Sequence, residues 1–422
     1  MKHIQTTFAH GNGPFSRVVD LVIEYNNLRE KNGLERLPAV FPLVPSYAFK
    51  GKEPGSRQKQ YMKEVAEEAA GKEFLLEHPY EFLLDIKQGE LLDKVLFKGS
   101  NYVEALKDLI EHSERNEEDF LRLIDNGERE IETLAGEKVT INPKDAEIEL
   151  SFNNRLRTGH PNSFYINGGA GYFSEILVRS LDMPRVKLNK EIIKKAIPHA
   201  ERLIDYQKLF FMSDPGVFSY DRDRTKAKST ELSCPPQIHI PKLDDTKLEK
   251  DGILVVVTGI SGLAESEMYD AVNEFGLQIY SGDDELNRKF SGIKHPPFKI
   301  ANPKIKAQIA RTGWSSVWQI HMLAEHGFNT GLLFPAYTPN DDPEILMNND
   351  GVKRLGLGVE IDVKNPKKSL ENALKLAELN RQFNDILKEK YGTLDGIDYV
   401  AETIFMYEQK KDISDRLKIE PV

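Results

Sequence analysis

An uninterrupted apolar run in the second half of the chain most constrains the fold. Residues 252–257 read Gly-Ile-Leu-Val-Val-Val and are followed by Thr-Gly-Ile-Ser-Gly at 258–262. A run of β-branched residues without polar alternation is typical of a parallel strand buried on both faces. Apolar residues then recur at helical spacing, at Met268, Ala271, Val272 and Phe275. Strand, turn and helix in this order predict an α/β domain.

The same alternation continues to the end of the chain. Periodicity and turn signals predict strands at 277–280 and 330–334, and helices at 304–311, 315–326, 343–354, 367–391 and 394–411. The first half begins in a similar way, with a strand at 3–9, a glycine loop, a helix that ends near Gly33, and a strand at 39–47. Beyond these, we expect mostly helix over 55–134, strands at 137–141 and 147–152, a helix near 173–181 and a helical stretch at 188–212.

The length of 422 residues predicts two domains at roughly 150 residues per domain, with an appendage. Residues 213–250 are rich in Pro, Asp, Lys and Ser, which is typical of a linker. We therefore expect two Rossmann-like domains of the α/β class that face each other across a cleft. Their predicted ranges are 1–212, with a helical insertion, and 251–365, followed by C-terminal helices at 366–422 that cross back to the first domain.

Composition excludes several classes of function. The net charge of −10 disfavours nucleic acid as the main partner. Cys234 is the only cysteine, so the chain has neither a disulfide framework nor a thiolate zinc cluster. The purest apolar run, 253–257, is far shorter than the roughly 20 residues of a membrane span, and the first residues resemble a strand rather than a signal peptide. We expect a cytoplasmic protein without a metal site or cofactor.

Three loops after predicted strands are candidate ligand sites. In the first, Gly259, Ser261 and Gly262 form a turn before a helix, where free backbone N–H groups and the helix dipole favour phosphate. The spacing matches neither the P-loop nor the dinucleotide-binding motif. A tight turn without a ligand explains these residues equally well.

The second loop precedes the helix predicted at 315–326. Arg311 places a fixed charge suited to pyrophosphate beside the helix start, and Gly313 permits close approach of the backbone. Ser315 or Ser316 can cap the helix, and Gln319 lies one turn further, where its amide suits a ribose hydroxyl. The alternative is a capped helix with Trp318 in the core.

The third loop follows the strand predicted at 330–334. Asp341 and Asp342 are suited to accept hydrogen bonds from sugar hydroxyls. Alternatively, one of them caps the helix that Pro343 begins. Adjacent carboxylates without histidine partners do not indicate a metal site.

In this order, the three loops resemble the donor-binding domain of GT-B glycosyltransferases over residues 252–362. The likeness is to the UDP-glycosyltransferases and to the N-acetylglucosaminyltransferase of peptidoglycan synthesis. The family's pyrophosphate- and ribose-binding stretch falls on Arg311, Thr312, Gly313, Trp314, Ser315, Ser316 and Gln319. Its sugar-binding element falls on Pro335 and on Asp341 and Asp342. Arg311 replaces a histidine of the family, and Gln319 replaces a glutamate.

The first half resembles the same superfamily through His10-Gly11-Asn12-Gly13-Pro14-Phe-Ser-Arg17. The family's loop, Gly-x-Gly-His-x-x-Arg, often supplies the base that deprotonates the acceptor. Aligning the glycines places Pro14 at that histidine, so His10 is the candidate base of an acceptor-side loop formed by Gly11, Asn12 and Gly13. The alternative is a histidine that ends a buried strand.

The resemblance implies transfer of a hexosyl or N-acetylhexosaminyl group from a nucleotide sugar, with UDP favoured, to a hydroxyl of a small-molecule or lipid-linked acceptor. It also implies inversion at the anomeric centre without a metal. A nucleotide-sugar epimerase and a non-catalytic nucleotide-sugar-binding protein are the alternatives. The basic amphipathic stretch at 188–212 suits an anionic membrane surface, but packing in the protein core is the favoured interpretation.

Overall fold

The chain folds into two compact units in the computed structural model, which describes residues 1–8, 12–95, 102–152, 156–167, 172–203, 205–213, 228–238, 251–256, 266–295, 305–325, 331–339 and 342–417. Unit 1 comprises Met1–Ser213, Asp223–His239 and Gly396–Val422. Unit 2 comprises Asp214–Arg222 and Ile240–Asp395. The end of the chain therefore returns to the first unit.

A mostly parallel sheet forms the centre of unit 1. Over the described residues its strand order is β5-β4-β3-β2-β1-β6-β7-β8-β9, and only the β3–β4 and β4–β5 pairs are antiparallel. The strands are β1 (His3–Phe8), β2 (Ala39–Pro42), β3 (Phe82–Asp85), β4 (Arg129–Thr133), β5 (Lys138–Ile141), β6 (Ala146–Phe152), β7 (Ser163–Asn167), β8 (Leu209–Ser213) and β9 (Glu231–Cys234). This order, with β1 in the middle and helical crossovers, is that of a Rossmann-like sheet.

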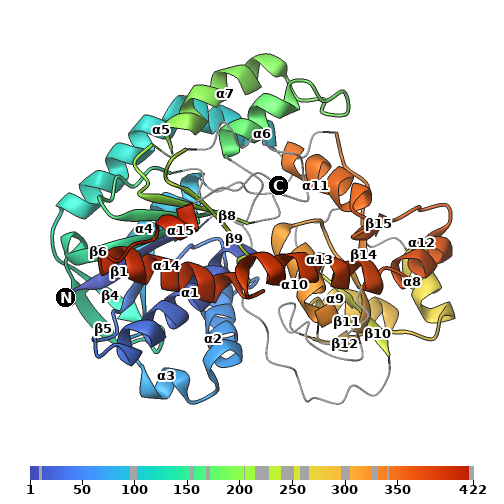
Figure 1. Ribbon diagram of the computed structural model, residues 1–422, viewed down its shortest axis with the longest axis horizontal. Helices are drawn as coiled ribbons and strands as arrows, with labels where there is room; N and C mark the ends of the chain where they lie inside the picture. Colours follow the sequence, from blue (N-terminus) through green and yellow to red (C-terminus); the bar gives the residue numbers. More distant parts are fainter. Residues whose placement is uncertain are drawn as a thin grey trace. The chain divides into compact units, whose positions relative to one another are not determined.

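Helices surround this sheet, and the last long helix packs against the first (Figure 1). They are α1 (Asn12–Lys31), α2 (Ser56–Ala70), α3 (Phe74–Glu77), α4 (Ile86–Val95), α5 (Tyr102–Asp125), α6 (Phe173–Ser180), α7 (Lys190–Arg202), α14 (Gly396–Glu408) and α15 (Ser414–Leu417), with a 3₁₀ turn at Pro143–Asp145. The hydroxyl of Tyr25 on α1 donates to the carboxylate of Glu408 on α14. Burial raises the pKa of Glu408 to about 7, because desolvation disfavours the charged carboxylate, whereas the hydrogen bond from Tyr25 favours it.

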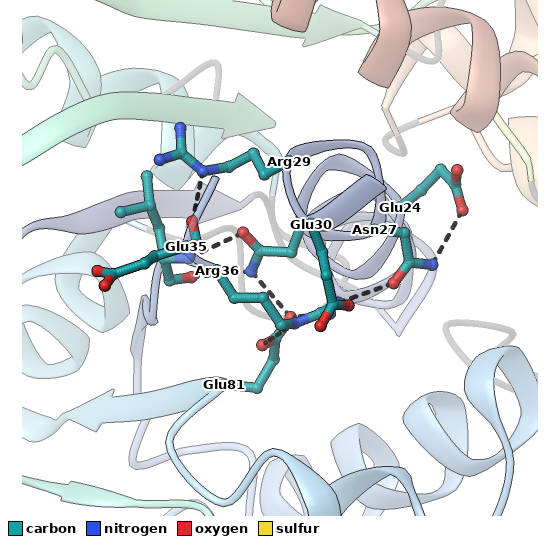
Figure 2. A network of polar contacts seen from close by, with 9 residues as sticks. Glu24, Asn27, Arg29, Glu30, Glu35, Arg36 and Glu81 are labelled. Carbon is teal, nitrogen blue, oxygen red and sulfur yellow. Dashed lines mark hydrogen bonds and ion pairs between the residues drawn. The ribbon is translucent and has the colours of Figure 1, made fainter. Parts of the chain in front are cut away.

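A polar network fixes the connection from α1 to β2 (Figure 2). The guanidinium of Arg36 donates to both carboxylate oxygens of Glu81, at 3.0 and 2.7 Å. Asn26 donates to the same carboxylate at 2.9 Å and to the carbonyl of Leu37 at 2.8 Å. The Glu81 side chain is only 2% exposed, so its charge depends on these partners.

The described strands of unit 2 form one fully parallel sheet with the order β12-β11-β10-β13-β14-β15. They are β10 (Gly252–Val255), β11 (Gln278–Ser281), β12 (Ile293–Lys294), β13 (Ile305–Ile309), β14 (Gly331–Phe334) and β15 (Gly358–Glu360). The helices between and after them are α8 (Ser266–Glu274), α9 (Asp284–Phe290), α10 (Trp314–Glu325), α11 (Pro343–Arg354), α12 (Pro366–Ala373) and α13 (Ala377–Tyr391). The predicted second Rossmann-like domain is confirmed.

Both faces of this sheet are covered. Ile253, Ala307 and Leu333 point into one core cluster with residues of α8 and α12. Leu254 and Leu332, which alternate with them, are fully buried on the other face. A Cβ atom at Gly331 would lie 2.0 Å from the carbonyl oxygen of Ala373, so glycine allows α12 to pack directly on β14.

Several predicted elements are wrong. Residues 304–311 were expected to be helical but contain β13, because Ile305-Lys-Ala-Gln-Ile309 is a buried strand between β10 and β14. The helical expectation for 55–134 misses β3 and β4, and that for 188–212 misses β8. The strand expected at 39–47 ends at Pro42. These strands have four or five residues each, too few to show a period.

Within the described ranges, no helix is both long enough and apolar enough to cross a membrane.

Candidate functional site

The loops that follow β13 and β14 lie at the same end of the sheet in unit 2. Ile309 at the end of β13 is paired with Val255 of β10 and Leu333 of β14, so the three carboxyl ends are adjacent. Arg311, Thr312 and Gly313 connect β13 to α10. Loops at this edge of an open parallel sheet are where ligands bind in such folds.

Two buried asparagines of α11 hold the loop after β13. The side chain of Asn348 donates to the carbonyl oxygen of Thr312 at 2.8 Å. Asn349 accepts from the Thr312 hydroxyl at 2.7 Å and donates to the carbonyl oxygen of Pro335, in the loop after β14, at 3.3 Å. All three side chains are almost completely buried, so α11 fixes both loops through interactions that water cannot replace.

A second link joins the beginnings of α10 and α11. The indole N–H of Trp314 donates to the carboxylate of Glu344 at 2.8 Å. Asp342 caps α11, because its carboxylate accepts from the backbone N–H of Glu344 at 2.9 Å. The capping interpretation of Asp342 is therefore correct, and whether it also binds a sugar stays a prediction. Trp318 is 1% exposed, as the core interpretation of that residue predicts.

The start of α10 leaves room for a ligand. Arg311, Gly313, Ser315, Ser316 and Gln319 are all partly exposed, whereas Thr312 and Trp314 are buried. A Cβ atom added at Gly313 would meet no atom of the described residues within 4 Å. The first N–H groups of a helix lack intrahelical acceptors, and a cation beside them adds to the same positive field. This edge of unit 2 is therefore suited to an anion.

Some predicted site residues lie outside the described residues. These are Gly259, Ser261 and Gly262 of the first loop, Asp341 of the third, and His10 and Gly11 of the acceptor-side loop. Asn12 is described only as the first residue of α1. The carbonyl of Gly13 accepts from Ser16 Oγ at 3.0 Å and from Arg17 Nε at 3.3 Å. Gly13 and Arg17 thus belong to one hydrogen-bonded turn at the start of α1.

A buried carboxyl group lies between the central strands of unit 1. Glu149 on β6 accepts from the hydroxyls of Thr158, at 2.5 Å, and Thr7, at 3.4 Å. Burial raises the pKa of Glu149 to about 7, although the hydroxyl donors favour the charged form. The position is fully buried, and nothing in the sequence pattern marks Glu149 as different from the other acids.

The basic helix α7 uses its apolar face within the protein. Ile193, Ala196 and Ala200 are buried, and α7 packs against α5 and α6. His199 and Ser113 are hydrogen-bond partners at 3.0 Å across the contact with α5. The apolar face is thus not available to a bilayer, in agreement with the favoured packing interpretation.

Sequence reasoning missed Asn348, Asn349 and Glu344. Two successive asparagines inside a predicted helix are an available signal, because asparagine is a poor residue for helix interiors. Within the described ranges, no group of three or more His, Cys, Asp or Glu side chains is arranged to hold a metal ion.

No protein-family model and no curated protein matches the sequence, whereas solved structures do. Spinosyn rhamnosyltransferase SpnG, complexed with thymidine diphosphate, gives a TM-score of 0.52 at 8% identity over 96% of this chain and 100% of that chain. Glycosyltransferase SnogD from Streptomyces nogalater gives 0.53 at 11% identity over 96% and 99%. MnaA from S. aureus, solved with UDP, gives 0.50 at 12% identity over 100% and 99%. The chain has the two-domain GT-B fold.

Proposed function

We propose that the protein is a glycosyltransferase that moves a sugar from a nucleotide-sugar donor to a hydroxyl acceptor, with inversion at the anomeric centre. Unit 2 binds the nucleoside diphosphate of the donor, preferably UDP, and unit 1 binds the acceptor.

The observation that carries this proposal is the start of α10. Arg311 and Gly313, beside which the described residues leave open space, lie at the carboxyl end of β13, in a loop fixed by the buried Asn348 and Asn349. A rigid loop loses little conformational freedom when an anion binds, so ordering the loop takes little away from the free energy of binding. Structures of similar fold bind thymidine diphosphate in SpnG and UDP in MnaA, which supports a pyrophosphate at this edge.

The chemistry follows from charge. As the glycosidic bond of the donor breaks, negative charge develops on the leaving diphosphate. Arg311 and the N–H groups at the start of α10 stabilise that charge, with Ser315 and Ser316 as further donors. A base removes the acceptor proton, and His10 is the candidate because an imidazole titrates near neutral pH. Gln319 binds the ribose, and Asp342, with Asp341, binds the sugar.

A product assay tests this function. The full-length protein is incubated with UDP- and TDP-sugars and a panel of hydroxyl acceptors, and products are separated by mass spectrometry. Glycosylated acceptor together with free nucleoside diphosphate, both absent without acceptor, is the expected result.

Two other results would contradict the proposal. Epimerised sugar formed without any acceptor would identify an epimerase, which the alternative reading of the fold allows. Tight donor binding with no release of nucleotide under any acceptor would identify a non-catalytic binding protein.

A further inference from the structure

Five aromatic rings form a continuous cluster at the carboxyl ends of β1 and β2 in unit 1. Phe8, the last residue of β1, stacks on Tyr47 with centroids 6.2 Å apart, and Phe15 of α1 stacks on Tyr61 of α2 at 6.5 Å. Phe49 meets Tyr61 edge to face at 6.4 Å. Phe8 and Phe15 are buried, Tyr47 and Tyr61 are half-buried, and Phe49 is 37% exposed. The cluster therefore extends from the core to the surface.

The loop that carries the outer rings is firmly held. The buried side chain of Gln58 donates to the carbonyl of Pro42 at 2.8 Å and accepts from the N–H of Val44 at 2.9 Å. The carbonyl of Tyr47 accepts from the first N–H groups of α2, at 3.0 and 3.1 Å. The N–H of Phe49 donates to Ser56 Oγ at 3.2 Å. Rings presented on such a loop are already ordered before a ligand arrives.

Arg57 adds a positive charge to this surface. Its guanidinium carbon lies 5.2 Å from the centroid of the Tyr61 ring, and its buried Nε has no hydrogen-bond partner among the described residues. Across the described ranges Arg57 forms no ion pair with a carboxylate, and neither do the neighbouring Lys50 and Lys52. Residues 45–57 contain these three cations and a single acid, Glu53, in a chain whose net charge is −10. The cations of this segment, and the buried Nε of Arg57 in particular, are thus suited to an anionic ligand.

We propose that Tyr47, Phe49, Arg57 and Tyr61, here called the ring surface, bind the acceptor, and that the acceptor is an aromatic molecule bearing an anionic group such as a carboxylate. The aromatic ring stacks on the exposed rings, and the anionic group pairs with the planar guanidinium. This inference rests on the proposed transferase function. The placement suits an acceptor, because Phe8 and Phe15 flank in sequence the loop that contains His10.

Binding of three small probes to the full-length protein tests the ring surface. 4-Hydroxybenzoate has the ring, the hydroxyl and the charge; phenol lacks the charge, and 4-hydroxycyclohexanecarboxylate lacks the aromatic ring. By isothermal titration, 4-hydroxybenzoate is expected to bind at least tenfold more tightly than either of the others. Arg57→Gln should weaken its binding by about tenfold to a hundredfold, the range of a charged hydrogen bond, and leave phenol unchanged. Phe49→Leu should weaken both aromatic probes.

The matched control is Lys59→Gln, which removes the same charge from the same helix. Lys59 pairs with Glu132. We expect the Lys59→Gln variant to bind 4-hydroxybenzoate with an affinity within twofold of wild type. If Arg57→Gln and Lys59→Gln lower the affinity for 4-hydroxybenzoate equally, general electrostatic attraction explains the binding and the proposal is overturned. Equal binding of 4-hydroxybenzoate and phenol, or no binding of any probe, would also overturn it.

A parallel titration with UDP separates this inference from the proposed function. UDP binding without binding of 4-hydroxybenzoate would reject the ring surface and leave the transferase proposal standing. Binding of 4-hydroxybenzoate without binding of any nucleoside diphosphate would reject the acceptor role, because no donor would be available to react with it.

Discussion

The hydroxyl of Thr312 donates a 2.7 Å hydrogen bond to the side chain of Asn349, 37 residues further along the chain. Asn349 also bonds to the carbonyl of Pro335, so one side chain joins the loops that follow two neighbouring strands. This contact converts two separate loops into one rigid edge of the sheet, where the donor nucleotide is proposed to bind.

A double-mutant cycle on this pair measures the coupling. Asn349→Ala leaves the buried Thr312 hydroxyl and the Pro335 carbonyl without their shared partner, so the free energy of unfolding should fall by about 1–3 kcal/mol. Thr312→Val alone removes one donor and leaves Asn349 its bond to Pro335. Urea unfolding of the two single variants and the double variant should give a coupling energy above about 0.5 kcal/mol. Purely additive losses would show that the contact does not form.

Gly313→Val tests whether the space beside α10 holds the ligand. An added Cβ meets none of the described residues within 4 Å, and glycine is better than valine directly before a helix, so the free energy of unfolding should fall by about 0.5–1.5 kcal/mol. The side chain would occupy the space proposed for the pyrophosphate, so the dissociation constant for UDP should rise at least tenfold. Gly276 cannot serve as the control position, because its backbone φ of +66° would strain any side chain added there. Unchanged UDP affinity in a folded Gly313→Val variant would place the ligand elsewhere.

Glu149 should make stability depend on pH. Burial raises the pKa of Glu149 from 4.5 to about 7 in the folded state. The stabilisation that the protonated side chain adds to the free energy of unfolding is therefore fully present below pH 4.5 and is lost as pH rises through 7. Glu149→Gln should therefore gain stability relative to wild type between pH 5 and pH 8, on the order of 3 kcal/mol. Urea unfolding at the two pH values gives this difference directly. The same stability difference at both would mean that Glu149 is ionised in the folded protein throughout.

Arg36 and Glu81 offer a test of the network in Figure 2. Arg36→Ala leaves the carboxylate of Glu81, 2% exposed, without its bidentate partner and should cost about 3–5 kcal/mol of unfolding free energy. Glu30→Gln removes the outer partner of the same guanidinium. Because Glu30 is 62% exposed, the loss should stay below about 1 kcal/mol. Similar losses in the two variants, measured by urea unfolding, would argue against a buried pair.

The sequence predicts the fold where elements are long or strongly patterned. The apolar run at 252–257 becomes β10, and the helix predicted at 343–354 is α11. It fails for β13, because polar Lys306 and Gln308 alternate with apolar neighbours over only five residues. The candidate loop was found from Arg311 and Gly313, whose types suggest anion binding. Asn348 and Asn349 were not predicted as part of the site. Their hydrogen-bond partners are determined by packing between distant segments, which leaves no local sequence pattern.

The most direct measurement of the central claim is a titration of UDP and TDP into wild type, Arg311→Gln and Lys306→Gln. Arg311 follows β13, whereas Lys306 lies near the opposite end of that strand, beside Asp251, so the two variants lose the same charge at different ends of the sheet. We predict that wild type binds at least one of the nucleotides, that Arg311→Gln weakens binding by about 1.5–3 kcal/mol, and that Lys306→Gln leaves it unchanged. Equal affinity in wild type and a folded Arg311→Gln variant, or no binding by wild type, would contradict the proposed donor site.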